Sequence, residues 1–226
     1  MKWWIIGILF LSLTSCKKDD PEPIDLGTDF YPIGVESVRI YDVDSIVFND
    51  FTLTQDTYQY EVKEVIMEST VDDGGRAIVK INRYARQTGQ DWKIQRVYTA
   101  HRDNFSVEEQ DQNLRVVKLN FALAPGVRWD GNARNVREKE EFECVSIQSE
   151  TLFGQSFSEV ALIDQYHQTD PLQLYTHIAT EKYARKVGLV HRYEKIIKRF
   201  TTGEPDDVPI DSGLVMEMKI KSFEVY

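Results

Sequence analysis

The sequence predicts a mainly β protein with little helix, built as a long antiparallel meander. Apolar and polar residues alternate with a period of two along several stretches, which is the pattern of half-buried antiparallel strands. Turn-forming residues separate these stretches, at Asp72-Asp73-Gly74-Gly75, Thr88-Gly89-Gln90 and Ala124-Pro125-Gly126. Their spacing of about ten to fifteen residues favours long strands. Such a meander forms either a curved, half-barrel-like sheet or a two-sheet sandwich, because both architectures use the same alternation.

Two stretches show this alternation most clearly. The first runs from Arg115 to Leu123, and one of its faces carries Val117, Leu119, Phe121 and Leu123. The second is the C-terminal run, whose apolar face carries Leu214, Met216, Met218 and Ile220. In both we expect the apolar residues to point inward and the polar residues, Lys118 among them, to point outward.

Six further segments have strand-like composition and lie between turn signals. They are 35–48, 57–71, 76–87, 91–101, 136–149 and 157–168. The segment from Leu172 to Phe200 is ambiguous, because its Lys, Glu, Ala and Leu residues also suit a helix. Its tyrosines lie among β-branched residues, and Gly188 would weaken a helix centre by about 1 kcal/mol. We therefore expect a strand, a bend near Val187-Gly188, and a second strand.

The N-terminus has the parts of a secretory signal peptide. Met1-Lys2 is a positive start, and Trp3 to Leu13 is an apolar run. A helix needs about 20 apolar residues to span a bilayer, so this run is too short for a permanent span. Residues 17–34 are rich in proline, glycine and acids, which is typical of a flexible tether. We expect a signal peptide over 1–15, an anchored Cys16 with its tether over 16–34, and one β-rich domain over 35–226.

Leu13-Thr14-Ser15-Cys16 resembles a bacterial lipobox, the processing site of secreted lipoproteins. The resemblance implies that Cys16 becomes the acylated first residue, carrying palmitate-type chains that anchor the protein in the outer membrane. Cys16-Lys17-Lys18-Asp19-Asp20 resembles the export tag of Bacteroidota lipoproteins, which implies the cell surface. The alternative is a solvated acidic linker on a protein that faces the periplasm.

Two short motifs in the mature chain resemble segments of uncharacterised envelope lipoproteins. They are the eight residues from Tyr183 to Val190 and the turn Trp129-Asp130-Gly131-Asn132. The resemblance implies a shared sheet scaffold and assigns no catalytic residue.

The charge of the chain restricts its partners. The formal net charge is −10, and no block of basic residues interrupts the acidic balance. Nucleic-acid binding needs a concentrated cationic face, so we expect no nucleic-acid partner. Binding to acidic lipids by surface charge is disfavoured as well, which leaves the acyl anchor as the membrane attachment.

The candidate reactive groups form no recognisable site. Cys144 lies in an alternating segment and has no cysteine partner once Cys16 is acylated, so we expect a buried, inert thiol. The spacing of the histidines fits no metal motif. We expect surface or half-buried side chains at His101, His167, His177 and His191.

The acidic groups have simpler interpretations than acid–base chemistry. Glu141 and Glu143 lie on one strand face, and Asp42 with Asp44 forms a similar pair. Calcium binding through Asp19, Asp20, Asp206 and Asp207 lacks the expected loop. No serine-nucleophile, phosphate-loop or zinc-protease motif is present.

These observations favour a non-enzymatic, lipid-anchored binding or accessory protein that needs no cofactor and contacts an envelope protein complex. The alternative is a carrier of a lipid or other hydrophobic ligand, which predicts an unusually apolar concave face. A surface enzyme that processes glycans is a third class, and it requires two carboxylates roughly 5 to 9.5 Å apart in a cleft.

Overall fold

The protein is one antiparallel sheet. A computed structural model describes residues 25–52, 54–170, 172, 174–200 and 209–226. These residues form a short 3₁₀ turn, η1 (Thr28–Phe30), and twelve strands: β1 (Val38–Asn49), β2 (Thr54–Val71), β3 (Ala77–Arg86), β4 (Lys93–Arg102), β5 (Ser106–Asp111), β6 (Leu114–Asn120), β7 (Arg128–Asp130), β8 (Glu141–Leu152), β9 (Gln155–Thr169), β10 (Tyr175–Ala184), β11 (Gly188–Lys198) and β12 (Ser212–Glu224).

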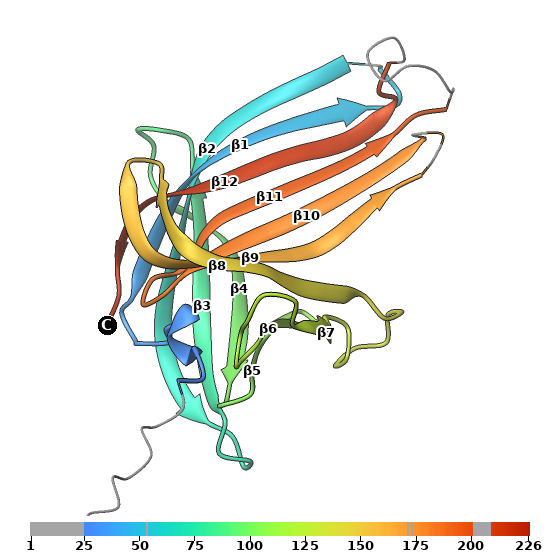
Figure 1. Ribbon diagram of the computed structural model, residues 1–226. Coiled ribbons are helices and arrows are strands. Elements are labelled where there is room, and N and C mark those ends of the chain that lie inside the picture. Colours follow the sequence, from blue (N-terminus) through green and yellow to red (C-terminus); the bar gives the residue numbers. More distant parts are fainter. Residues whose placement is uncertain (1–24, 53, 171, 173, 201–208) are drawn as a thin grey trace, which may run out of the picture.

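The strands follow the chain as a meander. Their order in the sheet is β6-β5-β4-β3-β2-β1-β12-β11-β10-β9-β8-β7, so the last long strand, β12, pairs with the first. The sheet curves into a nearly closed, barrel-like shape (Figure 1). This confirms the predicted antiparallel β class, and the single sheet selects the curved architecture over the sandwich.

Figure 1 also shows that the long strands extend beyond the barrel-like part. The outer ends of β2, β1, β12, β11, β10 and β9 run together as an open sheet, which we call the wing. Strands β3 to β8 stay in the barrel-like part. The molecule therefore has a packed end and a projecting end made from the same strands.

Two of the three predicted turns form hairpins, β2–β3 and β3–β4, whereas Ala124-Pro125-Gly126 links β6 to β7 at opposite ends of the sheet order. In the β2–β3 turn, the Asp72 carboxylate accepts hydrogen bonds of 2.9 Å from the backbone N–H groups of Gly74 and Arg76. Gly75 has φ 80°, a left-handed conformation that glycine adopts without steric cost. The ambiguous segment 172–200 forms β10, a turn and β11, as expected, and Gly188 has φ 94° at the start of β11.

The alternation pattern failed to predict two strands and placed one side chain, Lys118, on the wrong face of its strand. β5 and the three-residue β7 were not predicted. Between β5 and β6 the register shifts at Val107 and Glu108, which pair with Leu119 and Val117. Lys118 is thus the extra residue of a β-bulge, and bulges redirect side chains. The prediction that Lys118 points outward is wrong, because it is 8% exposed and contacts the interior.

Part of the predicted tether belongs to the folded domain. Phe30 and Tyr31 are 1% and 7% exposed, and both lie in the hydrophobic core. The Lys186 N–H donates to the Asp29 carbonyl, and Arg185 donates to the Asp29 carboxylate at 2.7 Å. The predicted boundary at residue 35 is therefore too late, because composition registers the prolines and acids but not the buried aromatic pair.

Replacing Phe30 by alanine tests whether this segment stabilises the domain. We expect Phe30→Ala to lower the free energy of unfolding by about 3–5 kcal/mol, because it empties a buried aromatic site. The matched control is Phe51→Ala, since Phe51 is 93% exposed and its removal should change the unfolding free energy little. Urea denaturation followed by circular dichroism measures both. Equal stabilities of the two variants would contradict the integration of residues 28–31.

Candidate functional site

The interior of the barrel-like part holds a cluster of charges around Glu181. This β10 side chain is 1% exposed. One carboxylate oxygen accepts hydrogen bonds from Lys118 Nζ and Arg192 Nε, each at 2.7 Å. The other oxygen accepts from Tyr183 Oη and Gln165 Nε2, each at 2.6 Å. Four strands, β6, β9, β10 and β11, therefore meet at a single carboxylate.

A second buried carboxylate, Glu64 of β2, lies in the same interior. Arg83 of β3 donates from Nε and Nη2 to one oxygen of this carboxylate, and the same oxygen accepts a hydrogen bond of 2.9 Å from Tyr98 Oη. Tyr41 Oη lies 3.5 Å from its other oxygen. A cavity of about 10 Å³ between these groups is too small to hold a ligand. The contacts around Glu64 thus form a closed polar core.

The electrostatics keep both carboxylates ionised. Burial works to raise the pKa of Glu181, but the charges of Arg192 and Lys118 and the hydrogen bonds of Lys118 and Tyr183 lower it to about 2. Burial also opposes ionisation of Glu64, yet Arg83 brings its pKa below the usual value. The pKa of Arg192 is raised, because Glu181 outweighs the effect of burial. Such fully paired groups stabilise a fold and are poor proton donors.

A hollow of about 370 Å³ opens on the concave side of this cluster. Its lining includes Lys118, Glu181 and Arg192, together with Arg96 and Asp111, which form an ion pair of 2.7 Å. This concave surface is charged. The hydrophobic-carrier alternative predicts an apolar concave face, so the lining disfavours it.

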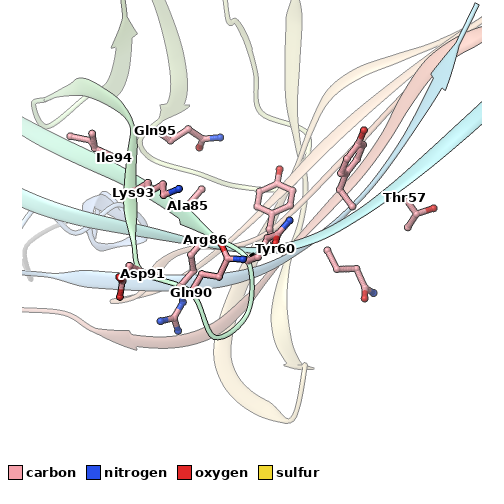
Figure 2. Close-up of a pocket in the computed structure, with 12 residues that line it drawn as sticks. Thr57, Tyr60, Ala85, Arg86, Gln90, Asp91, Lys93, Ile94 and Gln95 are labelled. Carbon is pink, nitrogen blue, oxygen red and sulfur yellow. Dashed lines mark hydrogen bonds between the residues drawn. The ribbon is translucent and has the colours of Figure 1, made fainter.

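A hollow of about 630 Å³ lies elsewhere, at the junction of the barrel-like part and the wing. Figure 2 shows Thr57 and Tyr60 of β2 on one side, with Gln90 and Asp91 of the β3–β4 turn on the other. The remaining lining residues are Tyr58, Gln59, Ala85, Arg86, Gln87, Lys93, Ile94 and Gln95. Four consecutive β2 residues thus contribute, which is the signature of an exposed strand edge.

The positive groups of this hollow differ in how they are held. Arg86 pairs with Glu61 at 2.5 Å and lies over the Trp92 ring, 4.1 Å from its centroid. Lys93 pairs in register with Ala85 at the start of β4. Glu61 already offsets the charge of Arg86, so Lys93 and Asp91 are the charged lining residues that remain.

The two cysteines lie in different parts of the chain. Cys16, the predicted lipidation site, and the apolar run that precedes it lie outside the described residues. Cys144 is a free, buried cysteine of β8, and burial and Glu143 raise the pKa of its thiol to about 11. The expected burial of Cys144 is confirmed, and its thiol is a poor nucleophile at neutral pH.

The candidate histidines have separate environments. His191 Nε2 lies 3.0 Å from Glu217 Oε1, and His177 stacks on Tyr166 with 3.9 Å between the ring centroids. Within the described residues, no three His, Cys, Asp or Glu side chains lie together in a way that could hold a metal ion. His101 is 9% exposed on β4, and the side chain of His167 is 66% exposed on β9.

The candidate carboxylates face outward and are paired. Glu141 and Glu143 contact Arg128 at 3.0 and 2.7 Å. Asp42 pairs with Lys221 at 3.0 Å, and Asp44 pairs with Lys219 at 2.5 Å. Asp19, Asp20, Asp206 and Asp207 are outside the described residues. In the part of the chain that the structure describes, no helix is long and apolar enough to cross a membrane.

Sequence reasoning missed the interior charges. Glu181 has the same strand parity as the buried Tyr183, so alternation could have placed an acid inside. Glu64 likewise shares its face with Val62 and Ile66. An acid at an inward position is a usable signal, because it requires a buried cation as its partner.

Comparisons with known proteins give structural matches of low identity. No family model matches the chain, and no curated protein matches it. One match is a candidate exported protein with a YmcC-like fold from Bacteroides fragilis NCTC 9343, at 8% identity and TM-score 0.47. Another is a candidate lipoprotein from Parabacteroides distasonis ATCC 8503, at 11% identity and TM-score 0.46. Each covers 86% of this chain and 98% of the other, and neither transfers a site residue.

The Glu181 cluster predicts an acid-sensitive fold. The folded pKa of about 2 lies below the usual glutamate pKa of 4.5, so this stabilisation is complete above about pH 4.5 and is lost as the pH falls towards 2. We expect Glu181→Gln to cost about 3–5 kcal/mol at pH 7, because Lys118 and Arg192 lose their anion. It should also flatten the dependence of stability on pH below 4.5.

Urea unfolding between pH 2.5 and 7 measures both effects. The control is Glu68→Gln, because Glu68 pairs with Lys80 on the surface and its loss should leave stability and pH profile nearly unchanged. If Glu181→Gln matched the wild type at pH 7, the cluster would not stabilise the fold.

Proposed function

We propose that the chain is a lipid-anchored binding or accessory protein of the cell envelope, without catalytic activity, and that its partner is an envelope protein. The observation that carries the proposal is the contrast between the two hollows. The interior charges are paired with one another, whereas the hollow of about 630 Å³ lies open beside an exposed strand. A surface of that kind suits contact with another molecule.

The state of the buried carboxylates supports a non-catalytic role. A general acid that works at neutral pH needs a raised pKa. The pKa values of Glu181 and Glu64 are both lowered, and each carboxylate accepts several hydrogen bonds. A glycan-processing site built on Glu181 would therefore lack its proton donor.

The N-terminal motif supports the location. Cys16 ends a sequence with the form of a lipobox, and an acidic stretch follows it. Two or more acyl chains give stable anchoring, because each buried methylene contributes about 0.8 kcal/mol. We propose an outer-membrane anchor at Cys16, with the folded domain at the cell surface and the periplasmic face as the alternative placement.

Crosslinking in the native membrane tests the proposal. A tagged full-length chain is crosslinked mildly, purified, and analysed by mass spectrometry for bound protein, lipid and glycan. We expect one envelope protein in stoichiometric amount with the wild type. Cys16→Ser should leave the membrane fraction and lose the partner, because both depend on the anchor. Cys144→Ser is the matched control and should retain both.

Two results would contradict the proposal. A stoichiometric lipid without a protein partner would favour a carrier, despite the charged concave surface. Retention of Cys16→Ser in the membrane fraction, with its partner bound, would show that the anchor is not at Cys16.

A further inference from the structure

The strand β2 has a free edge along its outer half. β2 pairs with β1 along Thr54–Val65, while its pairing with β3 begins only at Glu61 and runs to Val71. Residues Thr54–Tyr60 therefore have no strand partner on their β3 side in the part of the chain that the structure describes. Their side chains are exposed, except for the half-buried Tyr60. In Figure 1 this half of β2 borders the wing.

The direction of the free backbone groups follows from one pair of hydrogen bonds. Ile66 donates its N–H to the Ser37 carbonyl, and its carbonyl accepts from the Glu36 N–H, both on the β1 side. β1 and β2 pair without a register shift down to Asn49–Thr54, and the bonding direction alternates along a strand. Gln55, Thr57 and Gln59 thus direct their N–H and C=O groups away from β1, towards the open side.

Asp56 is the one charged residue along this edge, which has no other usual protection against pairing. Natural proteins block free edges with lysine, proline or bulges. The segment Thr54–Tyr60 contains no lysine or proline, and it has no bulge. The opposite border of the wing, Gln165–Thr169 of β9, is shorter and follows a register shift between Asp164 and Tyr166. The open edge of β2 is the better template for an added strand.

The adjoining hollow restricts what such a strand can be. The β3–β4 turn, with Gln87, Gln90 and Asp91, closes one end of the open edge, so only about seven residues can pair, or roughly 23 Å of extended chain. Tyr58 and Tyr60 offer aromatic surface on the concave side. Lys93 lines the same hollow and adds a positive charge to it.

We propose that residues Thr54–Tyr60 bind an extended segment of a separate envelope protein by β-strand addition, and that this segment carries an acidic residue. Main-chain hydrogen bonds to Gln55, Thr57 and Gln59 supply affinity, and the side-chain contacts supply selectivity. The segment's acidic group meets Lys93, and its apolar side chains pack on Tyr58 and Tyr60. This inference rests on the proposed function and names the mode of partner binding.

The first test uses synthetic peptides as probes. Random linear peptides of about twelve residues are selected by phage display against the full chain, and their affinities are measured by calorimetry. We expect the selected peptides to contain an acid. Thr57→Ala should bind them as the wild type does, because it keeps the backbone N–H. Thr57→Pro removes that N–H and should weaken binding about tenfold or more.

A matched proline on the other border of the wing controls for general damage. The Asp170 N–H bonds to Tyr175 of β10, so alternation directs the His167 N–H outward. His167→Pro should leave peptide affinity unchanged. Both proline variants should melt within a few degrees of the wild type, because neither N–H belongs to a ladder. Amide exchange gives a second measurement: peptide binding should protect the Thr57 and Gln59 amides.

Four results would overturn the inference. They are failure to select any peptide, unchanged affinity of Thr57→Pro, loss of binding by His167→Pro instead, and a wild-type dimer that Thr57→Pro converts to a monomer. The last result would assign the edge to a second copy of the chain. A separate experiment distinguishes this inference from the proposed function. If the envelope partner from native membranes still bound Thr57→Pro, the assignment of its binding site to Thr54–Tyr60 would be wrong, while the proposed accessory function would stand.

Discussion

The buried carboxylate of Glu181 is the interaction on which the curvature of the sheet depends. It joins β10 to Lys118 of β6, and β6 is the terminal strand at the far end of the sheet order. A buried charge is costly unless it is paired and hydrogen-bonded, so the strands that carry its partners must approach one another. Two contacts at the ends of the sheet add to this closure. The indole N–H of Trp129 in β7 donates to the Val117 carbonyl of β6, and the Val117 N–H donates to the Gly131 carbonyl.

The closed end leaves the other end free to act as a surface. The charges inside the barrel-like part satisfy each other, so the groups that line its hollow are already paired. The wing is built from the same strands, yet it loses the neighbours that would cover its borders, since β3 ends at Arg86 while β2 continues. Binding at such a border needs no change in the packed end. This separation suits an accessory protein whose fold must persist while partners come and go.

The strand pattern was predictable where side chains alternate without interruption. β12 was placed from parity alone, and Met218 and Ile220 are buried as that parity requires. β10 and β11 were placed from tyrosines among β-branched residues and from Gly188. Lys118 shows where the method fails, because a bulge turns this one residue inward while Val117 and Leu119 stay buried beside it. β7 was missed for a different reason: three residues are too few to show a period. The buried pair Phe30 and Tyr31 was hidden by the prolines and acids around it.

The sequence by itself determined the class of fold, the positions of most strands and the motif that suggests an anchored lipoprotein. These properties are local, since they depend on neighbours along the chain. Only the tertiary structure decided that Glu181 and Glu64 face inward with cations beside them, and that Thr54–Tyr60 is left without a partner. Both outcomes depend on which distant strand lies alongside and where its pairing stops. That information belongs to the register of the whole sheet, which no single strand specifies.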